Sequence, residues 1–78
     1  MKRSVVIKAL DDAFDDTLAL QYRNDLVDPL AVDRPNRDDI NAKFQRALRI
    51  NLEAYDIALR TIQANTTLED DEKSTSGE

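Results

Sequence analysis

"LRINLEAYDIALRTI", residues 48–62, carries two sets of apolar side chains on what its spacing predicts to be one helix. The first set recurs at intervals of three and four residues, which places it on a single helical face. Its members are Leu48, Leu52, Tyr55, Leu59 and Ile62. The second set lies roughly on the opposite side. Its members are Ala47, Ile50, Ala54, Ile57 and Ala58.

The charged residues of this stretch occupy a narrow arc between the two apolar sets. At about 100° per residue, the second set lies between about 180° and 280° from Leu48, and the charges lie between about 80° and 160°. A helix that rests on one small core needs only one apolar face. The second set therefore predicts contact with a neighbouring chain, through alanines that permit close helix approach. The simpler alternative leaves the second set exposed to water.

An earlier helix is predicted over residues 4–27. Ser4 is a suitable N-cap, and apolar residues then recur every fourth position as far as Leu26. Four of them are expected to pack against residues 48–62 as an intra-hairpin core, namely Leu10, Phe14, Leu18 and Tyr22. Asp28-Pro29 should end this helix, because proline disfavours helical geometry in the preceding residue.

The remaining segments complete an all-α, antiparallel two-helix hairpin over residues 1–65. Residues 28–36 form the connection, and Asn36 is a plausible N-cap for a second helix over 37–65, with Asp38 and Asp39 in its first turn. No glycine or proline interrupts residues 36–76. Residues 66–78 are polar and acidic, which predicts a disordered tail.

Length and composition also favour self-association. The chain has 78 residues with neither cysteine nor histidine, so neither a disulfide nor a thiolate metal site can reinforce a small core. No apolar run approaches ~18 residues, and aspartate follows the first residues too early for a signal peptide. We therefore expect no membrane span and a cytoplasmic protein, in the host cytoplasm if it is viral.

The residue types that most enzymes need are missing. Without histidine or cysteine, nothing activates the serines, and the only glycine, Gly77, rules out a glycine-rich phosphate loop. The segment "DDAFDD" matches a magnesium-binding DDxxD pattern, yet so short a chain cannot enclose the substrate of such an enzyme. We expect no catalytic residue, metal or cofactor. The acids fit a partner-binding face better. They are Asp11, Asp12, Asp15 and Asp16.

Charge is distributed unevenly along the chain. The formal net charge is −5, but residues 29–64 hold six basic and five acidic residues. Weak basicity per chain multiplies in an assembly of several copies, so that contact with DNA phosphates becomes possible without a basic overall balance. In a single copy the same residues would be an ordinary solvated surface. The candidate contacts are Arg34, Arg37, Lys43, Arg46 and Arg49.

Two stretches resemble the small terminase subunits of T7-like tailed phages. "ALDDAFDDTLALQYRNDLVD" is similar to their first-helix pattern, and "RPNRDDINAKFQRAL" is similar to the opening of their second helix. The resemblance covers about residues 8–60. It implies a ring of helical hairpins that binds viral DNA and regulates the large ATPase-nuclease subunit, with Ile50, Ala54 and Ile57 at the centre of the ring interface.

The same resemblance implies that the acidic C-terminal segment contacts the large subunit. The residues in question are Glu69, Asp70, Asp71 and Glu72. Many members of that family carry a separate helix-turn-helix domain, for which this chain has no room, so sequence-specific DNA recognition is not implied. Two alternatives stay open. One is a small acidic inhibitor that presents its aspartates in place of phosphates, and the other is a dimeric helical adaptor.

Overall fold

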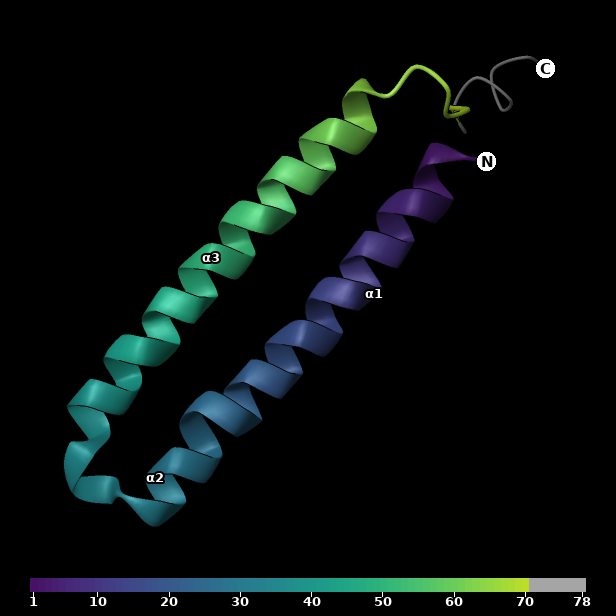
Figure 1. The fold of residues 1–78 in the computed structure, drawn as a ribbon. Coiled ribbons are helices and arrows are strands. Elements are labelled where there is room, and N and C mark those ends of the chain that lie inside the picture. The colour runs from purple at the N-terminus through teal and green to yellow at the C-terminus, as the bar shows by residue number, and fades with distance from the viewer. Residues whose placement is uncertain (71–78) are drawn as a thin grey trace.

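The computed structural model describes residues 1–70 of the 78-residue chain, and these form a helical hairpin (Figure 1). Helix α1 (Arg3–Gln21) continues through a π-helical segment η1 (Tyr22–Val27) into α2 (Asp28–Val32). A short 3-10 turn η2 (Arg34–Asn36) then leads into α3 (Arg37–Ala64). Within these residues there is no strand, which confirms the prediction of an all-α hairpin.

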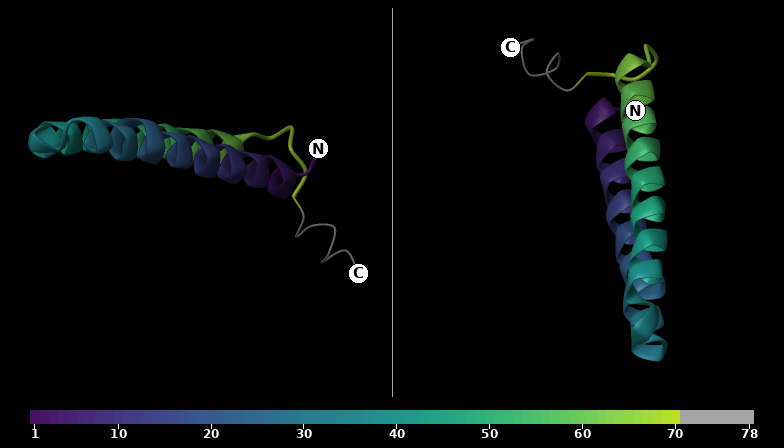
Figure 2. Two further views of the ribbon diagram at one scale, coloured as in Figure 1. Left: turned by 90° about the horizontal axis from the view of Figure 1, so that it is seen from below. Right: turned by 90° about the vertical axis from the view of Figure 1, so that its left-hand side faces the viewer.

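The hairpin is a long, thin rod with both described ends at one tip. Its extents are 61 × 17 × 15 Å, and the two helical arms lie side by side in a single layer (Figure 2). The radius of gyration is 17.8 Å. A compact domain of this length has a radius of gyration of about 11.5 Å. One layer of two helices has no second layer against which to bury side chains.

The first arm is longer at both ends than the predicted range of 4–27. Its N-cap is Lys2, so Ser4 lies inside the first turn and is not the cap. Pro29 does not end the helix either, because it lies in the first turn of α2, where a missing N–H is tolerated. The backbone N–H of Asp28 donates to the carbonyl of Arg23, five residues back. This π-type turn immediately before the proline lets the helical path continue to Val32.

The connection between the arms is therefore shorter than the predicted range of 28–36. The Asp33 backbone leaves helical geometry at φ −139° and ψ 63°, and its N–H donates to the Pro29 carbonyl at 2.8 Å. The Asn36 side-chain amide donates to Asp33 Oδ2 at 2.6 Å. Asn36 is the N-cap residue of α3, but its side chain makes no cap hydrogen bond and instead donates to Asp33.

The packing seam between the arms is made of half-buried residues. Of the expected core, seven members lie in this seam, namely Leu10, Phe14, Leu18, Leu48, Tyr55, Leu59 and Ile62. The rings of Phe14 and Tyr55 are the central pair, with centroids 5.1 Å apart and planes inclined by 53°. This distance and inclination are typical of favourable aromatic pairs.

Tyr22 and Leu52 do not belong to the core, since they are 56% and 51% exposed. Each step of four residues turns about 40° around a helix, so an every-fourth pattern drifts away from the seam. After four such steps from Val6, Tyr22 has left the contact. Gln21 and Asn51 occupy the seam instead, where the Asn51 amide donates to the Gln21 side-chain oxygen.

The two ends of the described chain are joined by Arg3. Its Nη1 donates to the carbonyls of Ile62 and Gln63, and its Nη2 donates to the Asn65 carbonyl at 2.9 Å. These are unsatisfied carbonyls at the C-terminal end of α3, where a positive charge is favourable. The Arg3 side chain is only 18% exposed, and its Nε also donates to Asp70 Oδ1 at 2.7 Å.

The first part of the predicted disordered tail is ordered against the N-terminus. The Glu69 N–H donates to the Met1 carbonyl at 3.1 Å, and the Arg3 N–H donates to the Glu69 carbonyl at 2.7 Å. These backbone bonds align Lys2 with Glu69 in a parallel bridge. Disorder from residue 66 onward is therefore wrong for residues 66–70. The rest of the predicted tail, from residue 71, lies outside the described residues.

Candidate interaction surface

The hairpin exposes its apolar side chains to an unusual degree. In residues 1–70, no side chain is buried. The large apolar residues that are most exposed on α1 and α3 are Val5, Leu20, Ile50, Leu52 and Ile57, and Tyr22 at the start of η1 is exposed as well.

One side of α3 combines this exposure with an absence of charge. At about 100° per residue, the second apolar set lies within about 60° of Ala54. The charged residues of the same stretch lie about 80° to 160° from Ala54, all on one flank. They are Arg46, Arg49, Glu53, Asp56 and Arg60. The side of α3 that holds Ala54 is therefore free of charge over about four turns.

Helix α1 extends this uncharged area onto the first arm. Ala13, Thr17 and Leu20 are exposed and lie within about 60° of one another, and the nearest aspartate, Asp16, lies outside their arc. Ala13 and Thr17 line the same hollow as Ala54, so both helices contribute to one surface. We call this surface the uncharged face. It comprises Ala13, Thr17, Leu20, Ala47, Ile50, Ala54, Ile57 and Ala58.

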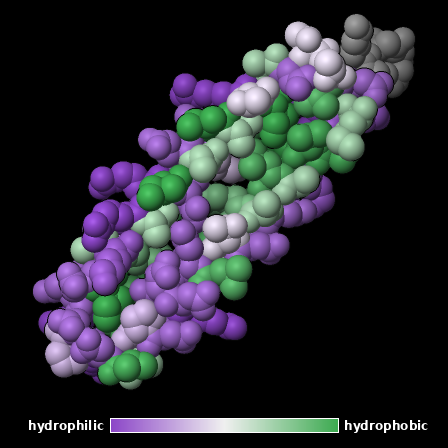
Figure 3. All heavy atoms as spheres, in the orientation of Figure 1, coloured by the Kyte–Doolittle hydropathy of each residue, from purple (hydrophilic) through white to green (hydrophobic). Residues whose placement is uncertain are grey.

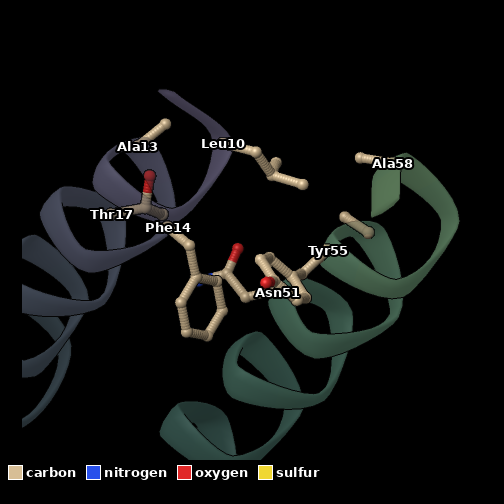
Figure 4. A pocket seen from close by; sticks show the side chains of 8 residues that line it. Leu10, Ala13, Phe14, Thr17, Asn51, Tyr55 and Ala58 are labelled. Carbon is tan, nitrogen blue, oxygen red and sulfur yellow. The ribbon is translucent and has the colours of Figure 1, made fainter. Parts of the chain in front are cut away.

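A groove runs along the uncharged face between the two helices. Its walls carry small side chains, and its floor includes the rings of Phe14 and Tyr55 (Figure 4). In the space-filling view, apolar atoms gather between the helices toward the end that holds the termini, with hydrophilic atoms along both outer edges (Figure 3). The groove is open to solvent and has a volume of about 240 Å³. Ligand pockets usually have about 300–1,000 Å³, so this groove suits protruding side chains better than a small molecule.

The structure places the five predicted interface residues of α3 on this face with different exposures. Ile50, Ala54 and Ile57 are exposed, at 66% for Ile50 and 59% for Ile57, whereas Ala47 and Ala58 are half-buried beside α1. Sequence reasoning missed the contribution of α1. The available signal was the spacing of three to four residues that joins Ala13, Thr17 and Leu20 among the aspartates.

The acidic residues of α1 lie outside the uncharged face, with Asp16 at its border next to Leu20. Asp11, Asp12, Asp15 and Asp16 are all exposed. Asp11 Oδ1 accepts a 2.5 Å hydrogen bond from the Tyr55 hydroxyl, and Asp12 pairs with Lys8 at 3.4 Å. The hydrogen bond to Asp11 raises the pKa of Tyr55, with smaller contributions from desolvation and from the negative charges of Asp11 and Asp15. The Phe14–Tyr55 pair therefore has the apolar groove on one side and the carboxylate of Asp11 on the other.

The candidate DNA-contacting residues are all exposed but do not form one compact patch. Arg34 and Arg37 lie at the turn between the arms. Lys43, Arg46 and Arg49 follow one another by about 60° around α3. Arg46 and Arg49 lie on the side away from α1, whereas Lys43 lines a hollow with Asp25 of the first arm. Within the part of the chain that the structure describes, none of these five side chains forms an ion pair. They remain available to an anionic partner.

Of the acidic residues expected to bind a partner near the C-terminus, two are described. Glu69 pairs with the N-terminal amine at 3.4 Å, and Asp70 pairs with Arg3. Both carboxylates are more than half exposed, so the pairs are surface pairs of small energetic value. Asp71 and Glu72 lie outside the described residues.

Other kinds of site find no support in the described part of the chain. Residues 1–70 hold no group of three metal-ligating side chains. None of their helices combines the length and the apolar character that crossing a bilayer requires. Comparisons with family models, with curated proteins and with solved structures found no match. The resemblance to small terminases therefore stays a prediction.

Proposed function

We propose that this chain is a noncatalytic helical hairpin that self-associates and regulates a nucleic-acid machine, in the manner of the small terminase subunits that it resembles. The observation that carries the proposal is the lack of any buried side chain in residues 1–70, combined with exposed Ile50 and Ile57. A monomer with this surface forgoes most of the hydrophobic stabilisation that a folded domain needs. Association of several copies would supply the missing hydrophobic stabilisation.

In this proposal, assembly also creates the DNA-binding surface. Each copy presents Arg46 and Arg49 on the outward side of α3, and Arg34 and Arg37 at the turn. Several copies held together would contact several phosphates at once, which raises affinity without any further contact per copy. A large ATPase subunit would bind the acidic segment that begins at Glu69.

The first experiment is the native mass in solution, measured by light scattering for the wild type and for Ile57→Asp. The proposal expects an assembly that Ile57→Asp dissociates, because a buried carboxylate at an apolar contact is strongly unfavourable. Gln45→Asp adds the same charge at an exposed polar position of α3 and should leave the mass unchanged. A wild-type monomer would refute self-association.

The second experiment measures binding to duplex DNA by fluorescence anisotropy at several salt concentrations. Arg46→Ala with Arg49→Ala should weaken binding and flatten its salt dependence, because fewer counterions are released. Gln45→Ala, at an exposed uncharged position directly before Arg46, is the control. An assembled protein without salt-dependent DNA binding would leave self-association standing and refute the DNA-binding role.

A second candidate function is a small acidic inhibitor that presents carboxylates in place of DNA phosphates. It is favoured by the exposure of Asp12 and Asp16 on the outer side of α1. An inhibitor of this kind needs no more than a dimer and should compete with duplex DNA for a DNA-binding enzyme. Asp12→Asn with Asp16→Asn should abolish that competition, whereas Ile57→Asp should not. A dimeric adaptor would show neither DNA binding nor competition.

A further inference from the structure

We propose that two copies of this chain pack uncharged face to uncharged face about a two-fold axis, so that their four long helices form a bundle. The inference rests on the self-association proposed above and adds the partner, the face and the participation of α1. The seam predicted from the sequence involved α3 alone. The structure instead joins Ala13 and Thr17 of α1 to Ala54 and Ala58 of α3 around one groove.

The shape of the hairpin leaves one long side open to a second copy. In residues 1–70 no side chain is buried, and the rod measures 61 × 17 × 15 Å. On the uncharged face, Ile50 is 66% exposed and Ile57 is 59% exposed. Obligate homodimers bury their exposed apolar side chains against each other, and a second copy that lies lengthwise along this side of the rod covers both isoleucines.

The charge distribution selects the face and favours a second copy as its occupant. A two-fold interface brings a surface against itself, so every charge near the axis meets a like charge. The uncharged face avoids this repulsion, although each copy carries a net charge of −5. The opposite side of the seam carries Asp11 and Asp15 beside Tyr55. Two copies that met through that side would bring their aspartates together.

The shape of the uncharged face is self-complementary. Small side chains at Ala13, Ala54 and Ala58 form a groove, and the apolar side chains of Ile50 and Ile57 stand exposed beside it. Bundles of helices pack when side chains of one helix enter hollows between side chains of the next. Two-fold pairing offers the isoleucines of each copy to the groove of the other.

The decisive experiment compares Ala13→Arg with Ala19→Arg. Both positions are exposed alanines of α1, but only Ala13 lines the groove. Light scattering at several protein concentrations should give twice the chain mass of 8.9 kDa for the wild type and for Ala19→Arg, and the chain mass for Ala13→Arg. Ala54→Arg, across the groove, should behave as Ala13→Arg does.

The outcomes separate this inference from the proposed function. If Ile57→Asp dissociates the assembly while Ala13→Arg does not, self-association stands and the two-helix interface is overturned. A wild-type assembly larger than a dimer that Ala13→Arg leaves intact overturns it as well. A wild-type monomer refutes both proposals.

A second measurement covers the case in which an arginine variant fails to fold. Because the chain has no cysteine, Ala13→Cys and Ala19→Cys each introduce a single thiol with a small side chain. The inference expects Ala13→Cys to react with a maleimide at least about tenfold more slowly than Ala19→Cys, because the bundle must open first. Equal reaction rates under conditions where the protein is folded would overturn the inference.

Discussion

The ring of Phe14 packs against the ring of Tyr55 in the centre of the seam, with 5.1 Å between centroids. Each ring comes from a different helix, and residues 14 and 55 are neighbours only because the chain reverses at residues 33–36. The groove of the uncharged face lies at one edge of this pair. At the other edge, Asp11 accepts a hydrogen bond from the Tyr55 hydroxyl. The aromatic pair that holds the arms together therefore lies between the uncharged face and the acidic side of α1, the two surfaces that we assign to interaction.

Truncating Phe14 should destabilise the hairpin more than truncating an exposed aromatic residue. We expect Phe14→Ala to lower the free energy of unfolding by about 2 kcal/mol, less than for a fully buried ring, because Phe14 is half-buried. Tyr22→Ala removes a ring that is 56% exposed and should cost clearly less. Urea unfolding at one fixed protein concentration checks both variants, since association contributes to apparent stability. Equal losses would contradict the seam described here.

The hydroxyl of Tyr55 should titrate above the ordinary tyrosine range. Its raised pKa arises first from donating a hydrogen bond to Asp11, which favours the protonated hydroxyl. A group whose pKa is raised on folding contributes stability below its unfolded pKa and loses that contribution as pH rises through the folded pKa. The contribution of Tyr55 is therefore complete at neutral pH and disappears in the alkaline range, above the ordinary value of 10.0.

Ultraviolet absorbance of the phenolate measures this titration. Tyr22→Phe leaves Tyr55 as the only tyrosine of the chain, so its signal stands alone. In that background Asp11→Asn should lower the pKa of Tyr55 toward the ordinary value, because the negative charge is lost and a neutral amide oxygen is a weaker acceptor than a carboxylate. Asp12→Asn is the control, since Asp12 pairs with Lys8 and not with the hydroxyl. An unchanged titration in Asp11→Asn would show that the hydrogen bond is not formed in solution.

Much of the fold followed from the sequence, because helical periodicity defines the two arms and Pro35 lies at the reversal between them. The α3 boundaries lie within one residue of the predicted 37–65, since Asn36 and Asn65 flank an uninterrupted periodic stretch. The errors arose where tertiary geometry overrides local preference. Pro29 is accommodated by the π-type turn before it, and Tyr22 leaves the seam because every-fourth spacing drifts around the helix.

The interaction surface was predictable only in part. The α3 half of the uncharged face was visible as a second apolar set, whereas the α1 half depends on which flank of α1 faces the same side as Ala54. That relation is set by the register between the arms, which a single helical wheel does not contain. The long-range bonds of Arg3 were invisible for the same reason, because a basic residue near the N-terminus says nothing about a distant helix end.

Arg3 should hold the two ends of the hairpin together. Replacing it with alanine removes donors to four carbonyls and to Asp70, and leaves the end of α3 without its cap. We expect Arg3→Ala to cost about 1–3 kcal/mol of unfolding free energy, in line with hydrogen bonds from a charged group. Hydrogen exchange should be faster at residues 62–69 than in the wild type. Arg3→Lys keeps the charge but not the planar fork and should recover only part of the loss.

The exposed neighbour Lys2 provides the comparison for that experiment. Lys2→Ala changes the same net charge at the same end of the chain, but the Lys2 side chain makes no hydrogen bond or ion pair within residues 1–70. Its effect on unfolding should be small. If Lys2→Ala and Arg3→Ala lower stability equally, the loss is one of overall charge and the Arg3 contacts are not what joins the ends.

The polar pair in the seam should fix the register between the arms. Gln21→Leu alone leaves the Asn51 amide without its partner in a half-buried position, and should cost about 1–2 kcal/mol. Gln21→Leu with Asn51→Leu replaces both polar groups and should restore stability, because two apolar side chains fit a seam as well as a satisfied pair does. The double variant should instead populate more than one register between the arms, since no hydrogen bond then distinguishes one register from another.

Amide NMR spectra test this role of Gln21 and Asn51. Broadened or doubled signals in the double variant, and single sharp signals in the wild type, would support it. Single sharp signals in both would assign the register to Phe14 and Tyr55 alone.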